Sequence, residues 1–358
     1  MMWTIGRMLT RMLLLRFAII LTGLTAFVLM LELITYSDSI LKVHDQKLVG
    51  FAYYALARAP GISAEFVTIA TLLGTLLMLT EISHRNELVA IWTTGVSQFR
   101  ILLALVPAAA IIGGFQFWLA DRAVPAAAPS LYEWGIGDYS SGKLNVSDQD
   151  PIWLQSGRDI LRAGSSNADA TYLRDVTIFR RDSNGVLIEQ IVAYEALREG
   201  DRWRLRQAAI YYRDNQVPNA VPELIYSGSI QPAATGKRSG NPDQMSIADL
   251  QLFITNAGFG IRPYFVYLTW LHKRLTLLLS AALMILIAVP LAHRFRRGGG
   301  LGALFAFGVT MGFGFFVFDG ISMTMGELGL LPPWLSAWTP VVVFATAAGT
   351  IAFRQETL

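Results

Sequence analysis

The sequence predicts an α-helical membrane protein with six transmembrane helices and one inserted periplasmic all-β domain of the jelly-roll type. Its composition is the first reason, because 53% of the residues are hydrophobic and only 15% are charged, whereas a soluble domain carries about 25% charged residues. Six long apolar runs are the second reason. A polar region with the pattern of β-strands, placed between the third and fourth runs, is the third.

Each apolar run is long enough for a transmembrane helix, which needs roughly 17–25 mostly apolar residues. The first run could instead be a signal peptide, but it is too long and no small-residue cleavage site follows it. The sequence therefore predicts six spans, at residues 12–35, 62–82, 101–120, 275–292, 301–323 and 334–353.

Basic residues predict the orientation, because cytoplasmic loops are enriched in Lys and Arg. With six spans, four basic clusters near span ends fall on one side, which places both termini in the cytoplasm. The predicted organisation is spans one to three at 1–122, an external domain at 123–262 and spans four to six at 263–358. The clusters contain Arg7, Arg11 and Arg16, then His84, Arg85 and Arg100, then 293–297, and finally Arg354.

The external region reads as antiparallel β-structure. Residues 171–182, 185–197 and 202–214 are rich in β-branched and aromatic side chains, turn signals at 183–185 and 199–201 separate them, and 150–163 supplies an earlier strand pair. This spacing predicts a sandwich or jelly roll. A short helix with Ser246 as N-cap is expected before the fourth span. Either a lipid groove or a packed core could use the expected inner-face residues Ile178, Leu187, Ile188, Ile191, Leu205 and Ile210.

Several classes of function are disfavoured. A net charge of +3 is too small to suggest nucleic-acid binding, and the absence of cysteine excludes thiolate metal sites and cysteine nucleophiles. Residues 137–144 have the spacing of a phosphate-binding loop but carry Leu144 where Ser or Thr should hold magnesium. A membrane-anchored enzyme with an external β-domain stays open as an alternative, although residues 122–262 contain no histidine.

Acidic residues inside the apolar runs include Glu32 in the first and Asp319 in the fifth. Because a charge inside a membrane is costly, each is a functional candidate that should face a cavity or a partner. Alternatively, Glu32 could reach the outer interface and Asp319 could cap a bent helix. Gly312, with the neighbouring glycines of the fifth run, would permit either helix sliding or close packing.

The order of elements and three stretches, 72–97, 245–275 and 328–344, resemble the LptF/LptG permease family of lipopolysaccharide exporters, with the last stretch closer to the LptG branch. This resemblance implies a Gram-negative inner-membrane subunit that pairs with an LptF-like permease. An LptB-like ATPase dimer would supply ATP and magnesium, so this chain would need no cofactor and would not be an enzyme. LptC- and LptA-like bridge proteins would receive the lipopolysaccharide. An ABC-type permease or scaffold for another lipid or a lipoprotein stays open, although its external domain usually lies between the first two spans.

The resemblance also implies site residues. The charged stretch after span two would be a coupling helix at about 84–95, in which Leu88, Ile91 and Trp92 share one face and can fill a groove on the ATPase. Glu87 would make the acidic contact there, beside Arg85. An interfacial amphipathic helix is the alternative. At the outer end of span one, Lys42 and Lys47 would bind lipid phosphates near Asp38 and Glu32, unless the lysines only snorkel. Spans one and five would form the gates, with Asp319 and Gly312 on the second of them.

Overall fold

A computed structural model describes residues 2–43, 47–84, 98–139, 152–156, 158–166, 172–183, 185–200, 202–213, 215–227, 241–255, 263–295 and 301–356. The chain divides into two compact units. A helical unit contains Met1–Ala127 and Thr269–Leu358, and a second unit, Ala128–Leu268, contains the β-strands.

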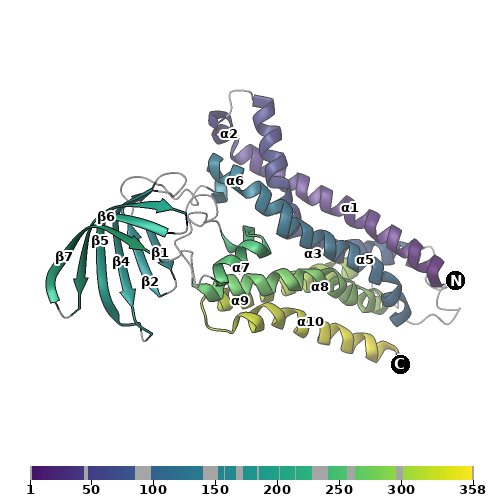
Figure 1. The fold of residues 1–358 in the computed structure, drawn as a ribbon. Coiled ribbons are helices and arrows are strands. Elements are labelled where there is room, and N and C mark those ends of the chain that lie inside the picture. The colour runs from purple at the N-terminus through teal and green to yellow at the C-terminus, as the bar shows by residue number, and fades with distance from the viewer. Residues whose placement is uncertain are drawn as a thin grey trace. The chain divides into compact units, whose positions relative to one another are not determined.

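Within the described residues, six helices are long and apolar enough to cross a membrane, which confirms the predicted number of spans. Five of them are single helical elements, and the third span continues through several elements (Figure 1). Their bounds are α1 Met2–Thr35, α3 Lys47–His84, α5 Gln98–Trp118, α8 Tyr264–Phe295, α9 Leu301–Glu327 and α10 Pro333–Glu356. A short helix, α2 Ser37–Val43, lies between α1 and α3.

Several helices extend well beyond the apolar runs. Helix α3 begins at Lys47 and passes through Pro60 before it reaches the apolar run. Helix α5 continues through a π-helical segment, η1 Leu119–Ala123, into α6 Val124–Trp134. Polar and proline residues lower the local hydropathy without ending the helix, because neighbouring helices support the backbone there. As a result, charged residues near the span ends lie inside helices.

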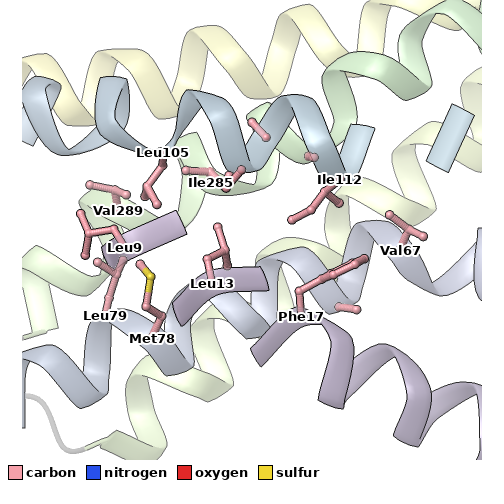
Figure 2. Close-up of a cluster of buried hydrophobic side chains, with 14 of the residues drawn as sticks. Leu9, Leu13, Phe17, Val67, Met78, Leu79, Leu105, Ile112, Ile285 and Val289 are labelled. Atoms are coloured by element: carbon pink, nitrogen blue, oxygen red, sulfur yellow. The ribbon is translucent and has the colours of Figure 1, made fainter. Parts of the chain in front are cut away.

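One face of α1 anchors the core of the helical unit. Leu9, Leu13, Phe17 and Leu21 recur every fourth residue and are buried, as expected for one helical face. They pack on α3, α5 and α8 through residues such as Met78, Leu105 and Ile285 (Figure 2). The opposite face of α1 is exposed and apolar, with Phe27, Met30 and Ile34 about 60% accessible. Such a face suits lipid or another membrane helix as its neighbour.

Small and polar residues set the closest helix approaches. A Cβ atom placed on Gly113 of α5 would lie 2.4 Å from the carbonyl oxygen of Leu278 in α8. One turn further along α5, the buried Gln116 donates to Thr68 Oγ1 at 3.1 Å and accepts a hydrogen bond from Ser280 Oγ. Helices α3, α5 and α8 are therefore joined by side-chain hydrogen bonds within their apolar surroundings, where an unpaired polar group would be costly.

The second unit contains one antiparallel sheet in the order β1-β2-β4-β5-β6-β7, with β3 paired to β4. The expected strands at 150–163, 171–182, 185–197 and 202–214 are confirmed, and Gly185 and Gly200 adopt positive φ in the two predicted turns. One long strand was not predicted: β7 contains Pro218 and Pro222 at the sheet edge, where a missing N–H is tolerated. The bounds are β1 Ile152–Ser156, β2 Asp159–Ala163, β3 Ser165–Ser166, β4 Tyr172–Arg181, β5 Leu187–Glu199, β6 Arg202–Tyr212 and β7 Asn215–Tyr226.

The sheet bends along a row of residues that crosses four strands. Asp175, Tyr194, Gln207 and Pro222 are in register with one another, but the ladder pairing is interrupted at each of them. Asp175 and Gln207 have φ near +50°, a conformation that kinks a strand. The alternation of buried and exposed side chains is offset by one residue across this row. As a result, Leu173 and Val176 in β4 face the same side although they are three residues apart, and so do Leu205 and Ala208 in β6.

This bend folds the sheet over its own buried face. Ile178, Ile191, Leu205 and Ile210 lie in that core as predicted, whereas Leu187 and Ile188 are more than 40% exposed. The antiparallel β-structure is confirmed, and the described strands form one sheet in which they follow one another in meander order. Because short turns join successive strands, neighbours in sequence stay neighbours in the sheet. In the described residues the inner face is filled by side chains, which favours a packed core over a lipid groove.

The helix expected after the sheet is also confirmed. Helix α7 spans Ile247–Thr255. The Ser246 hydroxyl accepts a hydrogen bond from the backbone N–H of Asp249 at 3.2 Å and donates to the Asp249 carboxylate at 2.7 Å. This is a reciprocal cap of the kind that starts a helix.

Candidate functional site

The residues expected to contact the lipid lie at and beyond the C-terminal end of α1. Helix α2 follows α1 with Asp38 in its first turn and Lys42 in its last. Both side chains are exposed, and Ile40 between them is buried. Residues four apart lie on one face of a helix, so the two side chains extend from the same face of α2. Lys47 begins α3, and its side chain lies outside the described residues.

Glu32, the acidic residue of the first span, faces α3 rather than the outer interface. Arg58 donates to both of its carboxylate oxygens, at 3.0–3.2 Å, and the Tyr54 hydroxyl donates to it at 3.3 Å. The Glu32 and Arg58 side chains are only 18% and 11% exposed. A carboxylate held in this way neutralises a buried arginine, as intramembrane charges usually require.

Asp319 of α9 also has a basic partner. The Lys273 ammonium group of α8 donates to its two oxygens at 2.5 and 2.6 Å, and each side chain is 15% exposed. Nearer the start of α8 and the end of α9, Trp270 Nε1 donates to Glu327 at 2.5 Å. Helix α9 runs without a break from Leu301 to Glu327, so Asp319 does not cap a bend. Its carboxylate joins the C-terminal half of α9 to the N-terminal half of α8.

Gly312 of α9 lies against α3. A Cβ atom there would come within 2.6 Å of a Leu72 methyl group, and one on Gly308 within 2.2 Å of a Leu76 methyl group. These glycines let the N-terminal half of α9 approach α3 closely. Two kinds of contact therefore hold the fifth span: glycine contacts along its N-terminal half and an ion pair along its C-terminal half.

The coupling residues Arg85, Glu87, Leu88, Ile91 and Trp92 lie outside the described residues. The structure describes the two helix ends that flank them in sequence: α3 ends at His84 and α5 begins at Gln98. Near the end of α3, Glu81 pairs with Arg16 of α1.

Sequence reasoning missed Arg58, Lys273 and the Arg16–Glu81 pair. Arg58 and Lys273 lie just outside the counted apolar runs, although inside the helices. The acidic residues in the apolar runs could have indicated these partners, because a buried carboxylate requires a basic partner at similar depth on a neighbouring span. Among the residues that the structure describes, no group of three or more His, Asp or Glu side chains is placed to hold a metal ion.

Comparison with known proteins gives a consistent result. A family model for the lipopolysaccharide export system permeases LptF/LptG matches residues 7–354. The chain is 24% identical to the lipopolysaccharide export system permease protein LptG of Haemophilus influenzae over 298 residues, which cover 81% of this chain and 82% of that protein. It is 23% identical to the LptG protein of Escherichia coli K12 over 315 residues, 86% of each chain. With its six apolar helices and inserted antiparallel sheet, this chain belongs to the LptF/LptG family of lipopolysaccharide export permeases.

Proposed function

We propose that this chain is a permease subunit of an ABC transporter that extracts lipopolysaccharide from the inner membrane and passes it to a periplasmic bridge. The observation that carries this proposal is the family match over nearly the whole chain, from residue 7 to residue 354. The relatives named LptG favour the LptG-like role in a pair with an LptF-like permease. Helix α9 supports a paired arrangement, because its apolar side chains Phe313, Phe316 and Ile321 are more than half exposed.

The energy would come from an LptB-like ATPase dimer, since the sequence offers no complete phosphate-binding loop. Leu88, Ile91 and Trp92 would enter a groove on that ATPase, and Glu87 and Arg85 would make polar contacts at its rim. The position of this stretch supports the proposal, because basic residues at both of its ends predict a cytoplasmic loop. ATP and magnesium would bind to the partner, so this chain would act without a cofactor of its own.

The lipid would meet α2 first on the outer side. Lys42 is exposed there, and an ammonium group forms charge-assisted hydrogen bonds with phosphates. Lys47 would add a second cation, and Asp38 would orient Lys42 from one turn away. For Glu32 we propose a supporting role, because its carboxylate already accepts hydrogen bonds from Arg58 and Tyr54 and an anion does not attract an anionic lipid. Asp319 and Gly312 would set the position of the second gate helix.

The β-unit would dock LptC- and LptA-like bridge proteins through an edge of its sheet. Strand β7 supports this role, because it is the last strand in the sheet order and pairs on one side only among the described strands. An extended edge can accept a strand from another β-domain. Since the described inner face is filled by side chains, we propose that this unit contributes an edge and not an acyl-chain groove.

Orientation and function need separate experiments. The chain has no cysteine, so Ser156→Cys and Gly299→Cys can each be labelled alone in intact cells with a membrane-impermeant thiol reagent. We expect Ser156→Cys to react and Gly299→Cys to stay unlabelled, and the reverse pattern would reject the periplasmic position of the β-unit.

For function, the chain should be purified from its native membrane and its companions identified by mass spectrometry. A stoichiometric ATPase and a bound glycolipid are the expected result. A different bound lipid would favour the alternative of a permease for another lipid. Purification without any ATPase would reject the transporter and return attention to an enzyme with an external domain.

A further inference from the structure

Contacts between α1 and α3 occur at four levels along their length. Arg16 pairs with Glu81 at one end, where both side chains are less than one-third exposed. Next comes Gly74, whose added Cβ would lie 3.1 Å from the backbone nitrogen of Phe17. Thr25 and Ser63 share a hydrogen bond at 3.2 Å, and Glu32 pairs with Arg58 at the other end. From the first contact to the last, the residue numbers increase in α1 and decrease in α3. The two helices are therefore antiparallel and in contact along this whole length.

These contacts restrict both sliding and rotation. Each ion pair fixes the axial position of one helix against the other, because moving by one turn of about 5.4 Å would separate its charges. In apolar surroundings, separated charges are strongly disfavoured. The backbone approach at Gly74 keeps the helices close between the two pairs. Figure 1 shows α1 and α3 side by side in the helical unit.

Glu81 also has a particular place in the sequence. It lies three residues before His84, the last residue of α3, and residue 85 begins the stretch proposed to contact the ATPase. Helix α5, which follows that stretch, contacts α1 as well: the ring centroids of Phe17 and Phe115 are 6.4 Å apart. A displacement of the stretch therefore reaches α1 through the helix on either side of it.

We infer that Arg16 and Glu81 are positioning residues that join α1 to α3 as one body, so that a movement of residues 85–97 by the ATPase also moves α1. Glu32 and Arg58 complete the connection at the outer end, where α1 leads into the lipid-contacting helix α2. This inference rests on the proposed function. It adds a mechanical connection between the residues proposed to contact the ATPase and those proposed to contact the lipid. These two groups lie at opposite ends of the α1–α3 pair.

Spin labels test the inference without relying on transport. Leu15 in α1 and Leu56 in α3 are 57% and 76% exposed. Because Gly74 lies level with Phe17, Leu15→Cys with Leu56→Cys gives a diagonal pair separated by roughly 30 Å along the helices. In the complex with its ATPase, we expect the same distance distribution without nucleotide and with trapped ATP. A shift of about 5 Å between the two states, one helical turn, would overturn the inference.

Transport then tests the ion pair itself. Arg16→Gln and Glu81→Gln should each lower the lipopolysaccharide exported per ATP hydrolysed by about fivefold or more, as expected for loss of coupling, and should make the labelled distance depend on nucleotide. Arg11→Gln is the matched control, because Arg11 is an exposed cation on the same helix. It should leave both readouts unchanged.

A charge exchange completes the test. The double variant Arg16→Glu with Glu81→Arg keeps both charges and should restore export per ATP, even if the single variants fold poorly. Normal export per ATP in the single variants, or no recovery in the exchange, would refute the role of the pair. If the unmodified complex exports no lipopolysaccharide, the proposed function fails instead, and the spin-label result still decides whether α1 and α3 move together.

Discussion

The hydroxyl of Tyr226 in β7 donates a 2.7 Å hydrogen bond to the Asp159 carboxylate in β2. These strands are four steps apart in the sheet order, which would separate them by roughly 19 Å in a flat sheet. Arg180 of β4 lies over the Tyr226 ring, 5.8 Å from its centroid. The bond therefore closes the folded sheet over its core, and it links the edge strand β7 to the opposite part of the sheet.

Removing this bond should loosen β7 before the rest of the sheet. Tyr226→Phe keeps the buried ring but leaves the Asp159 carboxylate without its phenolic donor, at a cost of about 1.5–3 kcal/mol. Hydrogen–deuterium exchange of the full chain should show faster exchange in β7 and β2. Tyr211→Phe, at an exposed position of β6, is the control. Equal protection in both variants would show that the bond does not hold the sheet closed.

Removing one charge of the Lys273–Asp319 pair should destabilise the protein more than removing both charges. Asp319→Asn leaves a largely buried lysine without its charge partner and should destabilise the helical unit by about 3–5 kcal/mol, measured as a lower unfolding temperature in detergent. The double variant Lys273→Met with Asp319→Leu removes both charges and should recover most of that loss. If the double variant is no more stable than Asp319→Asn, the pair does not account for the effect.

Adjacent glycines of α5 should tolerate alanine very differently. Gly113→Ala would place a methyl group 2.4 Å from the Leu278 carbonyl oxygen, whereas nothing lies within 4 Å of a Cβ on Gly114. Forced separation of α5 and α8 should cost about 1–3 kcal/mol or more. We expect thermal unfolding of Gly113→Ala at a clearly lower temperature and of Gly114→Ala near that of the unmodified protein. Similar values for the two would contradict the close packing of α5 on α8.

Lys42 should matter through its charge and not through packing, since its side chain is exposed. Lys42→Asp should weaken photo-crosslinking of lipopolysaccharide to α2 and slow export, because an anion there repels the lipid phosphates. The bound ATPase should be retained. Lys42→Arg keeps the charge and should behave nearly like the unmodified chain. Unchanged crosslinking in Lys42→Asp would make Lys42 a simple interface anchor.

Most of the architecture could be predicted from the sequence, because transmembrane helices and β-strands each have a simple hydrophobic pattern. Apolar runs marked all six spans, and alternating segments marked the strands other than the short β3 and the proline-containing β7. The inner-face assignment was wrong for Leu187 and Ile188. Ile188 is three residues from the buried Ile191, so regular strand alternation places it on the opposite face, and Leu187 is the first residue of β5, at the end of the buried cluster.

Of the candidate site, sequence identified the charges but not their partners. Glu32 and Asp319 stood out because they interrupt apolar runs. Arg58 and Lys273 did not, because they lie where hydropathy already falls. A pairing between spans depends on the axial offset of two helices, and that offset is fixed by contacts such as Gly74 on Phe17. No local pattern in the sequence encodes it.

The most direct test of the proposed function is ATP-driven release of lipopolysaccharide from vesicles that contain this chain, its ATPase and its partner permease. We expect release to a soluble acceptor only while ATP is hydrolysed. With Glu87→Ala, release per ATP should fall, because the ATPase would lose the polar contact proposed at the rim of its groove. Release that is independent of ATP, or the same release per ATP with Glu87→Ala, would contradict the account.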